Sequence, residues 1–231
     1  MTEHDYEIDG ALIAEVFKLT STEERTPLPR HRHNLTRSQV ETSQRARIIV
    51  ATAEIVNEIG YAATTSRAII ERAGVSSKTF YALFGDKESA FYATYSLLDG
   101  VVLSYARNPP RSSTSAAMAV EGITAFLEQV AAVPLFTRLR MVEAPAAGRR
   151  ALELQRDILR EFAGTLHGLI SEAAQDDPEL TVPSEEVLFL FVGGMHQLIL
   201  THILEHGTTS LPELAPTILD ALRRLIYGGP K

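Results

Sequence analysis

Apolar residues in this chain recur at steps of three and four positions, and this periodicity limits the fold more than any other feature. From about Thr42 to Ile59 it matches one face of a helix, which is expected to end at Gly60. No segment shows a convincing two-residue alternation of the kind that marks a half-buried strand. The sequence therefore predicts an all-α protein whose helices end at glycines and prolines.

The expected helices divide the 231 residues into three parts. Residues 1–40 form an acidic and then basic extension, partly flexible, with a short amphipathic helix near Ile8–Leu19. Residues 41–90 form a head of short helices, and residues 91–231 form a larger helical domain. Counting the helix that joins the two, the long helices are expected over Lys87–Arg107, Ser115–Ala132, Pro134–Glu143, Gly148–Gln175, Ser184–His206 and Leu211–Tyr227.

Composition excludes several classes of protein. The chain has no cysteine, so disulfide frameworks and thiolate metal sites are excluded. The first ten residues are acidic and do not resemble a secretion signal. The longest apolar run, Val187–Leu200, includes His196 and Gln197 and is too short to span a bilayer. We expect a cytoplasmic protein without a membrane partner.

Charge is distributed unevenly along the chain. The net charge of −7 argues against nucleic acid as a partner of the whole molecule. Residues 30–87, however, hold nine basic and five acidic side chains, whereas the segments on both sides are acidic. One part of the protein is therefore suited to attract a polyanion.

The run TTSRAIIERAGVSSKTFYALF, Thr64 to Phe84, predicts a helix, a tight glycine turn and a second helix. This is the order and spacing of a helix-turn-helix. Gly74 permits a positive φ at the turn, and Phe80 is expected to point inward. The second helix is then left with four outward side chains, which are Ser77, Lys78, Thr79 and Tyr81.

Over Arg45–Tyr92 the sequence resembles the TetR-type one-component transcriptional regulators. The residues that carry the resemblance are Gly60-Tyr61, Thr64-Thr65, Ala73-Gly74-Val75-Ser76, Thr79-Phe80-Tyr81, Phe84 and Asp86-Lys87-Glu88. Two features depart from the family pattern. About forty residues precede the head, and Val56 stands where the family usually has an aromatic residue late in its first helix.

The resemblance implies which side chains contact DNA. Those expected at phosphates are Thr65, Ser66, Arg67, Tyr81 and Lys87. Those expected in the major groove are Ser77, Lys78 and Thr79. Of these, Lys78 and Ser77 are the residues suited to read base edges, and lysine prefers guanine O6 and N7.

The basic arm Arg30–Arg37 has two interpretations. It could follow the DNA backbone or enter a minor groove, as homeodomain arms do, or it could be a solvated linker. Its histidines, His31 and His33, are flanked by arginines, which makes a poor metal site. We expect no metal and no cofactor.

A small head touches few base pairs, so a twofold dimer is expected, binding a palindromic operator. The helix over Ser184–His206 is more apolar than one buried face requires, although the same residues could form the core of the monomer. The residues expected at the dimer interface are Phe189, Val192, Met195, Ile199, Ile203, Leu214, Ile218 and Leu222.

In TetR-type regulators the middle helices enclose a ligand pocket, and the resemblance implies one here. The residues expected to line it are Tyr95, Phe126, Phe136, Leu139, Arg140, Glu143, Phe162, Leu166 and His196. Apolar members of this set could equally be ordinary core, and the polar ones could lie on the surface. An apolar pocket suggests a hydrophobic or amphipathic effector.

The function expected is that of a ligand-responsive transcriptional regulator, a repressor that binds double-stranded operator DNA as a homodimer and that a small molecule releases. An enzyme is not expected, because the sequence lacks HExxH, GxSxG, a phosphate-binding glycine loop and a cysteine nucleophile. Two alternatives remain, which are an architectural DNA-binding protein without an effector and an enzyme that uses Glu143 and His196 as acid and base.

Overall fold

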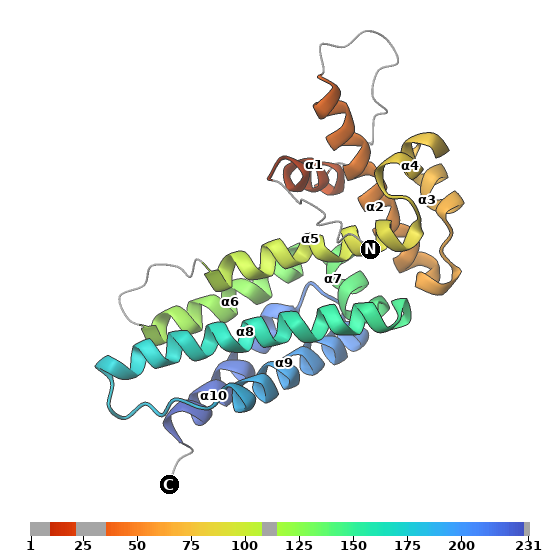
Figure 1. The fold of residues 1–231 in the computed structure, drawn as a ribbon. Helices are drawn as coiled ribbons and strands as arrows, with labels where there is room; N and C mark the ends of the chain where they lie inside the picture. Colours follow the sequence, from red (N-terminus) through yellow and green to blue (C-terminus); the bar gives the residue numbers. More distant parts are fainter. Residues whose placement is uncertain (1–9, 22–35, 108–114, 229–231) are drawn as a thin grey trace. The chain divides into compact units, whose positions relative to one another are not determined.

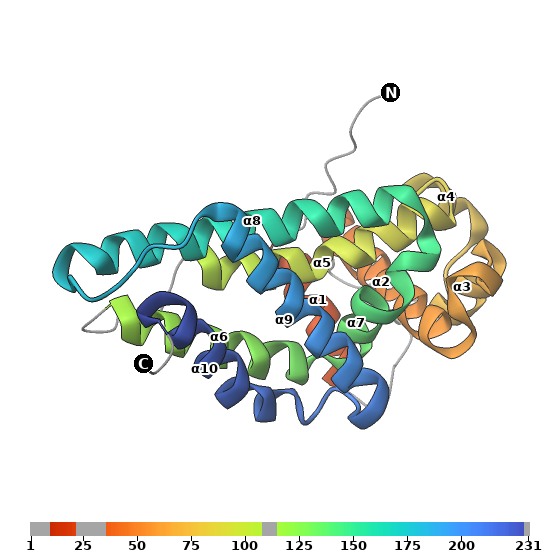
Figure 2. The same cartoon turned by 90° about the horizontal axis from the view of Figure 1, so that it is seen from below.

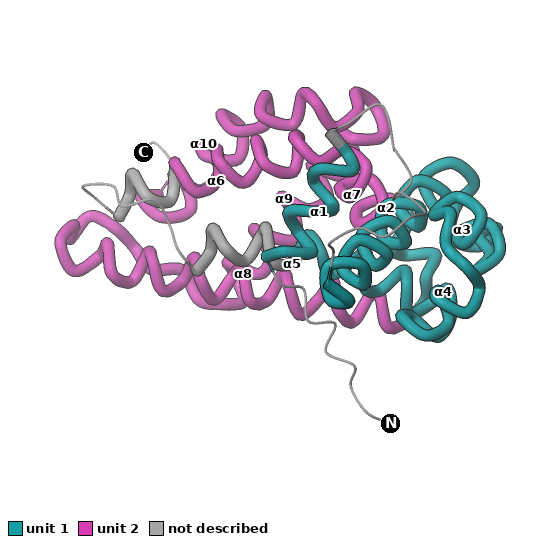
Figure 3. Tube along the Cα trace, turned by 90° about the horizontal axis from the view of Figure 1, so that it is seen from above, with its two compact units in different colours: residues 1–98, 143–148 teal, residues 99–142, 149–231 magenta. Residues whose placement is uncertain are grey.

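Figure 1 shows a computed structural model of the chain, which describes residues 10–21, 36–107 and 115–228. The regular elements in these ranges are all helical, so the predicted all-α class is confirmed. The chain forms two compact units, coloured separately in Figure 3. Unit 1 comprises residues 1–98 and 143–148, and unit 2 comprises residues 99–142 and 149–231. Most of the predicted basic arm, up to residue 35, lies outside the described residues.

Unit 1 begins with α1 (Gly10–Ser21), which packs against α2 (Arg37–Ala63). Val16 on α1 is fully buried, as expected for the apolar face of an amphipathic helix. Helix α2 begins five residues earlier than the periodicity predicted. The reason is a capping box, in which the Thr36 hydroxyl accepts from the Gln39 N–H and the Gln39 side chain accepts from the Thr36 N–H.

Gly60 interrupts α2 near its C-terminal end. Its φ of 79° and ψ of 156° are not helical, and the positive φ favours glycine. Thr64 closes the turn that follows, because its N–H and its hydroxyl donate to the Gly60 carbonyl at 3.2 and 2.8 Å. The break predicted at Gly60 is therefore present, and one more helical turn follows it.

Helices α3 (Ser66–Ala73) and α4 (Ser77–Leu83) are joined by a turn at Gly74. Gly74 has a φ of 60°, and a Cβ there would lie 2.6 Å from the Arg47 guanidinium. Arg47 in turn donates to the Gly74 carbonyl at 3.3 Å. The backbone angle favours glycine here, whereas the arginine is a flexible side chain that could move aside. Phe80 on α4 is fully buried and fixes this short helix against the rest of unit 1.

Unit 2 is a layered set of helices, seen from two sides in Figures 1 and 2. Helix α8 contacts α9 and α6, and α10 contacts α6. Their facing apolar side chains form one continuous core. The helices are α6 (Ser115–Ala132), α7 (Pro134–Arg138), α8 (Arg149–Asp176), α9 (Glu185–His206) and α10 (Ala215–Tyr227), together with α5 (Lys87–Arg107), which begins in unit 1.

The segment after α7 differs from the continuous helix predicted over Pro134–Glu143. Residues Leu139–Glu143 form a π-helical turn, and Ala144–Ala147 form a 3₁₀ turn. Short π-helical insertions are uncommon and often lie at functional sites. The chain passes from unit 2 to unit 1 within this turn, between Val142 and Glu143.

Candidate functional site

The first residues of α4 form an exposed polar surface of the helix-turn-helix. Ser76 caps the helix, since its hydroxyl accepts from the Thr79 N–H at 3.0 Å. The Thr79 hydroxyl lies 2.9 Å from the same oxygen, so it is partly engaged within the turn. Ser77 and Lys78 are exposed. Their side chains are accessible to a molecule outside the protein, as the sequence predicted.

Tyr81 and Phe80 are neighbours in the sequence with opposite environments. The Tyr81 side chain is 54% exposed, while Phe80 is fully buried. The two rings meet edge to face, with centroids 5.3 Å apart. Phe84, one turn further on, is also buried. The buried pair therefore orients the tyrosine outward, with its hydroxyl available to a phosphate oxygen.

The start of α3 presents a second group of predicted phosphate contacts. Thr65 caps the helix by accepting from the Ala68 N–H at 3.2 Å, and it is exposed. Ser66 is half-buried. The Arg67 side chain is 87% exposed and forms an ion pair with Glu71 of the same helix at 2.8 Å. This hydrogen bond raises the pKa of Arg67 above its usual value.

Lys87, the eighth predicted DNA contact, has partners inside the protein. Its ammonium donates to the carbonyl oxygens of Tyr61 and Thr64 at 3.2 and 2.7 Å. It also lies 4.6 Å from the centre of the Tyr61 ring. A lysine in this position neutralises the carbonyl end of α2. The structure thus gives Lys87 a stabilising role that the sequence reasoning missed, besides the phosphate contact predicted for it.

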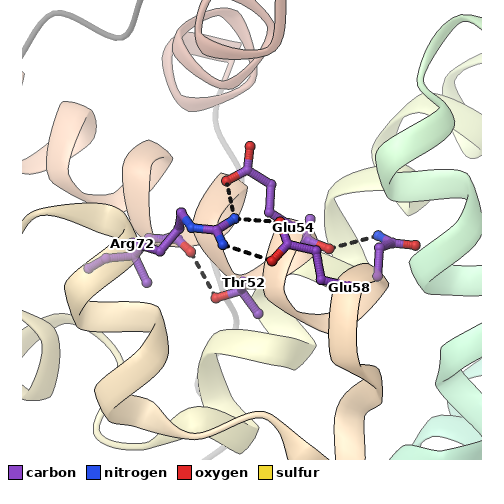
Figure 4. A network of polar contacts seen from close by, with 7 residues as sticks. Thr52, Glu54, Glu58 and Arg72 are labelled. Carbon is purple, nitrogen blue, oxygen red and sulfur yellow. Dashed lines mark hydrogen bonds and ion pairs between the residues drawn. The ribbon is translucent and has the colours of Figure 1, made fainter.

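Arg72 joins α3 to α2 through two carboxylates, as Figure 4 shows. Its guanidinium donates twice to Glu58, at 2.7 Å each, and once to Glu54, at 3.3 Å. The hydrogen bonds with Glu58 raise the pKa of Arg72 and lower the pKa of Glu58. A carboxyl group whose pKa is lowered by folding stabilises the folded state, and this stability is lost only when the pH falls through that lowered pKa. The Arg72–Glu58 pair therefore persists at neutral pH.

Unit 2 contains a cavity of about 40 Å³ whose described lining is mainly apolar. Its three polar lining residues are Arg140, Gln155 and His196. The Gln155 side-chain nitrogen lies 3.0 Å from the His196 Nε2. Burial, and then the nearby Arg140 cation, lower the pKa of His196. The apolar lining residues are Phe126, Met141, Ile158, Leu159, Phe162, Val192, Met195 and Ile199.

Four of the predicted pocket residues line this cavity, which are Phe126, Arg140, Phe162 and His196. Others are placed elsewhere, with Phe136, Leu139 and Leu166 buried in unit 2. Tyr95 and Glu143 belong to unit 1, where Tyr95 is buried and the Glu143 carboxylate accepts from the Tyr61 N–H at 3.3 Å. Gln155 was missed, because a glutamine on an amphipathic helix gives no sign that it faces inward.

The residues predicted for a dimer interface are mostly core. Six of the eight are buried inside unit 2, namely Val192, Met195, Ile199, Ile203, Ile218 and Leu222. Phe189 and Leu214 are partly buried against the same core. In the single chain these six side chains pack in the core of unit 2, which is the arrangement that the monomer-core alternative predicts. The accessible apolar residues of α9 are different ones, which are Val187, Leu190, Leu198 and Leu204.

Two helices joined by a tight glycine turn, the second with an exposed polar start, have the arrangement of a helix-turn-helix, in which the second helix enters the DNA major groove. A family model described as bacterial regulatory proteins of the tetR family matches residues 48–93. Residues 48–93, which lie in unit 1, are thus similar to the tetR family of bacterial regulatory proteins in the region that contains the helix-turn-helix.

Solved structures of regulators share this fold. The transcriptional regulator FadR from Bacillus subtilis, in complex with stearoyl-CoA, has a TM-score of 0.66 and 18% identity, covering 80% of this chain and 98% of its own. The fatty acid degradation regulator FadR from Bacillus halodurans has a TM-score of 0.69 and 16% identity, and the match covers 78% of this chain and 94% of that protein. GusR from Salmonella enterica has a TM-score of 0.62 and 21% identity, and the match covers 84% of this chain and 96% of that protein. None of the curated proteins compared with the chain matches it.

Removing the Lys78 ammonium is expected to change both affinity and specificity. On an operator selected from random duplexes, Lys78→Ala should weaken binding by about 1–3 kcal/mol, because a base-reading contact is lost. On unselected duplexes the loss should be smaller. Tyr81→Phe should weaken binding equally on both, because its hydroxyl contacts a phosphate. Fluorescence anisotropy at fixed salt measures both, and equal losses for Lys78→Ala would contradict the base-reading role.

Two arginines of α3 provide a matched pair of variants. Arg72→Gln should destabilise unit 1 by about 0.5–1.5 kcal/mol, because it breaks hydrogen bonds between helices. Arg67→Gln should leave the melting temperature unchanged and weaken DNA binding, because this exposed side chain pairs only within its own helix. Thermal unfolding followed by circular dichroism separates the two effects. Equal melting temperatures for both variants would show that the Arg72 network does not hold α3.

Proposed function

We propose that the chain is a ligand-responsive repressor of transcription that binds palindromic operator DNA as a homodimer. A small hydrophobic or amphipathic effector releases it. The observation that carries this proposal is the exposure of Ser77, Lys78 and Tyr81 on α4. The opposite side of this helix is fixed by the buried Phe80. The match of residues 48–93 to the tetR family model supports the role of this surface in DNA binding.

The cavity in unit 2 favours a regulator with an effector over an architectural protein without one. Its described lining combines apolar walls with three polar groups, which is the usual composition of a small-molecule site. The enzyme alternative paired Glu143 with His196. The Glu143 carboxylate is instead bound to a backbone N–H of unit 1, whereas His196 lines the cavity of unit 2. This arrangement does not favour an acid–base pair.

The exposed apolar side of α9 supports a dimer through a face other than the one predicted from sequence. Leu190 is 75% exposed and Leu204 is 62% exposed, with Val187 and Leu198 between and beside them. Their successive spacings of three, eight and six residues place them within an arc of about 120° on one side of the helix. A Cβ added at Gly194 would meet nothing in this chain, so a second backbone could approach there.

The same apolar surface gives α9 the length and composition of a membrane-crossing helix. A soluble helix reaches this composition when one side packs in the core and the other meets a partner chain. Here one side of α9 packs into the core of unit 2. An exposed apolar patch of this kind typically marks a protein interface. We assign it to a symmetry-related copy, because a palindromic operator requires two heads.

The π-helical turn offers a route by which a ligand could affect DNA binding. Arg140 and Met141 line the cavity, and only Val142 separates them from Glu143. Glu143 accepts from the Tyr61 N–H, at the break in α2 that Lys87 also holds. Single π-turns frequently lie at functional sites. We propose that an effector which displaces Met141 alters the Glu143 contact and so the helix-turn-helix.

A charge on the exposed side of α9 should break the dimer. Leu190→Asp is expected to weaken dimerisation by about 100-fold or more, because the symmetric interface buries the carboxylate twice. Leu152→Asp, on an exposed position of α8, is the control and should stay dimeric. Analytical ultracentrifugation gives the assembly state, and footprinting on a selected operator gives the symmetry of the complex. A monomeric wild type with an asymmetric footprint would contradict the proposed dimer.

The proposed role of Glu143 can be tested with any compound that binds the wild type and releases DNA. Glu143→Ala should keep the affinity of the DNA-free protein for that compound within about twofold. The factor by which the compound weakens DNA binding should fall close to one. The measurement is DNA affinity with and without saturating compound. Glu153→Ala, on the surface of α8, should retain full coupling, and retention of full coupling in Glu143→Ala would refute this route.

A further inference from the structure

The exposed side of α9 carries a seam of regularly spaced residues. Six exposed residues follow one another at alternating steps of three and four positions, which are Val187, Leu190, Gly194, Gln197, Thr201 and Leu204. Such steps average about 3.5 residues, which is the repeat of helices that pack along one another. The spacing therefore marks a surface that fits another helix.

The seam is apolar toward its ends and polar in its middle. Leu190 and Leu204 are 75% and 62% exposed. Between them lie Gly194, which has no side chain, and Gln197, whose amide donates to the Thr201 hydroxyl at 3.4 Å. A Cβ built at Gly194 would come within 4 Å of nothing in the described part of the chain. The middle of the seam thus combines an open space with a long side chain three residues further on.

This order of residues is complementary to itself when two copies run in opposite directions. Antiparallel helices centred on the midpoint of the seam place Gly194 opposite the partner's Gln197, and the twofold axis repeats this pair. Val187 then faces the partner's Leu204, so apolar residues meet at both ends. Close packing favours a large side chain opposite a small one. A parallel pair would instead set glycine against glycine and glutamine against glutamine.

We propose that α9 pairs with α9 of a second copy in antiparallel, with the twofold axis between Gly194 and Gln197. The proposal rests on the proposed function, because it assumes the dimer and names the residues that meet at its axis. Each Gln197 side chain lies over the partner's Gly194. Gln197 therefore determines specificity, since a chain with a larger side chain at the position of Gly194 would overpack the axis twice.

Charge limits how far the two copies lie along one another. Glu186 and Glu205 are exposed near the two ends of α9, whereas the six seam residues are uncharged. The antiparallel pairing brings Glu186 toward the partner's Glu205, and like charges repel. The helices therefore cross at an angle and diverge toward their ends, as packed helices commonly do. The closest approach is then at the glycine.

The chain contains no cysteine, so single cysteine variants test the pairing directly. Gly194→Cys and Gln197→Cys are purified separately, mixed, allowed to exchange subunits and then oxidised. Because a disulfide requires Cα atoms within about 7 Å, the mixture should crosslink at least about fivefold faster than either variant alone. Leu152→Cys, mixed with either variant, is the control and should not crosslink. Faster crosslinking of each variant with itself would indicate a parallel pair and overturn the proposal.

Reciprocal size changes test the packing at the axis. Gly194→Gln should weaken dimerisation by about 100-fold, because both axis contacts are then overpacked. Gln197→Gly should weaken it by about tenfold, because both contacts then leave voids. A mixture of the two variants again sets a large residue opposite a small one at both contacts, and ultracentrifugation should show dimers within about threefold of wild-type affinity. A mixture as weak as the single variants would contradict the pairing.

Two further readouts separate the pairing from the proposed function. A wild type that stays monomeric would refute the dimer itself, whereas a dimer without the crosslink between positions 194 and 197 would refute only this pairing. Circular dichroism of each variant reports the helical fold. Gly194→Gln is expected to keep it, because the added Cβ meets nothing in the described chain and glutamine favours a helix more than glycine does.

Discussion

The burial of Phe80 is the interaction on which the DNA-binding surface depends. Helix α4 has seven residues, which is too short for a helix to be stable alone in water. Phe80 is fully buried, and Phe84 adds a second buried ring one turn later. Because these rings fix one side of the helix, Ser77, Lys78 and Tyr81 are exposed on the other without contributing to the core. Because these residues do not hold the fold, they are free to vary with the DNA that we propose they read.

The break in α2 is a second point on which several contacts converge. Gly60 ends the regular helix, and the carbonyl oxygens freed by the break accept from Lys87, while the Tyr61 N–H donates to Glu143. Both partners come from segments that lie outside the helix-turn-helix run. The orientation of α2 within unit 1 is therefore sensitive to α5 through Lys87 and to the π-turn through Glu143. A junction of this kind can respond to events elsewhere because neither contact is strong alone.

Local features of the sequence predicted the helices well, but they could not predict contacts between residues far apart in the chain. Glycines and prolines marked the breaks because they act on the backbone at their own position. Exposure of Ser77 and Lys78 followed from the turn at Gly74. Glu143 was assigned to a pocket although it contacts Tyr61, 82 positions away, and no periodicity reveals such a contact. Helix α9 is apolar around most of its circumference, so periodicity could not separate the buried Val192 from the exposed Leu190.

The two sides of α9 link the cavity to the proposed dimer. Val192, Met195 and His196 line the cavity, while Leu190 and Leu204 are exposed on the same helix. Because a packed interior transmits strain, we expect a ligand that displaces these lining side chains to act on the exposed side of the helix as well. An effector acts only by binding two states with different affinity. In the proposed dimer, the two states would then differ in the pairing of α9 with its symmetry mate as well as in the Glu143 contact, and we expect both changes to alter how the two copies engage one operator.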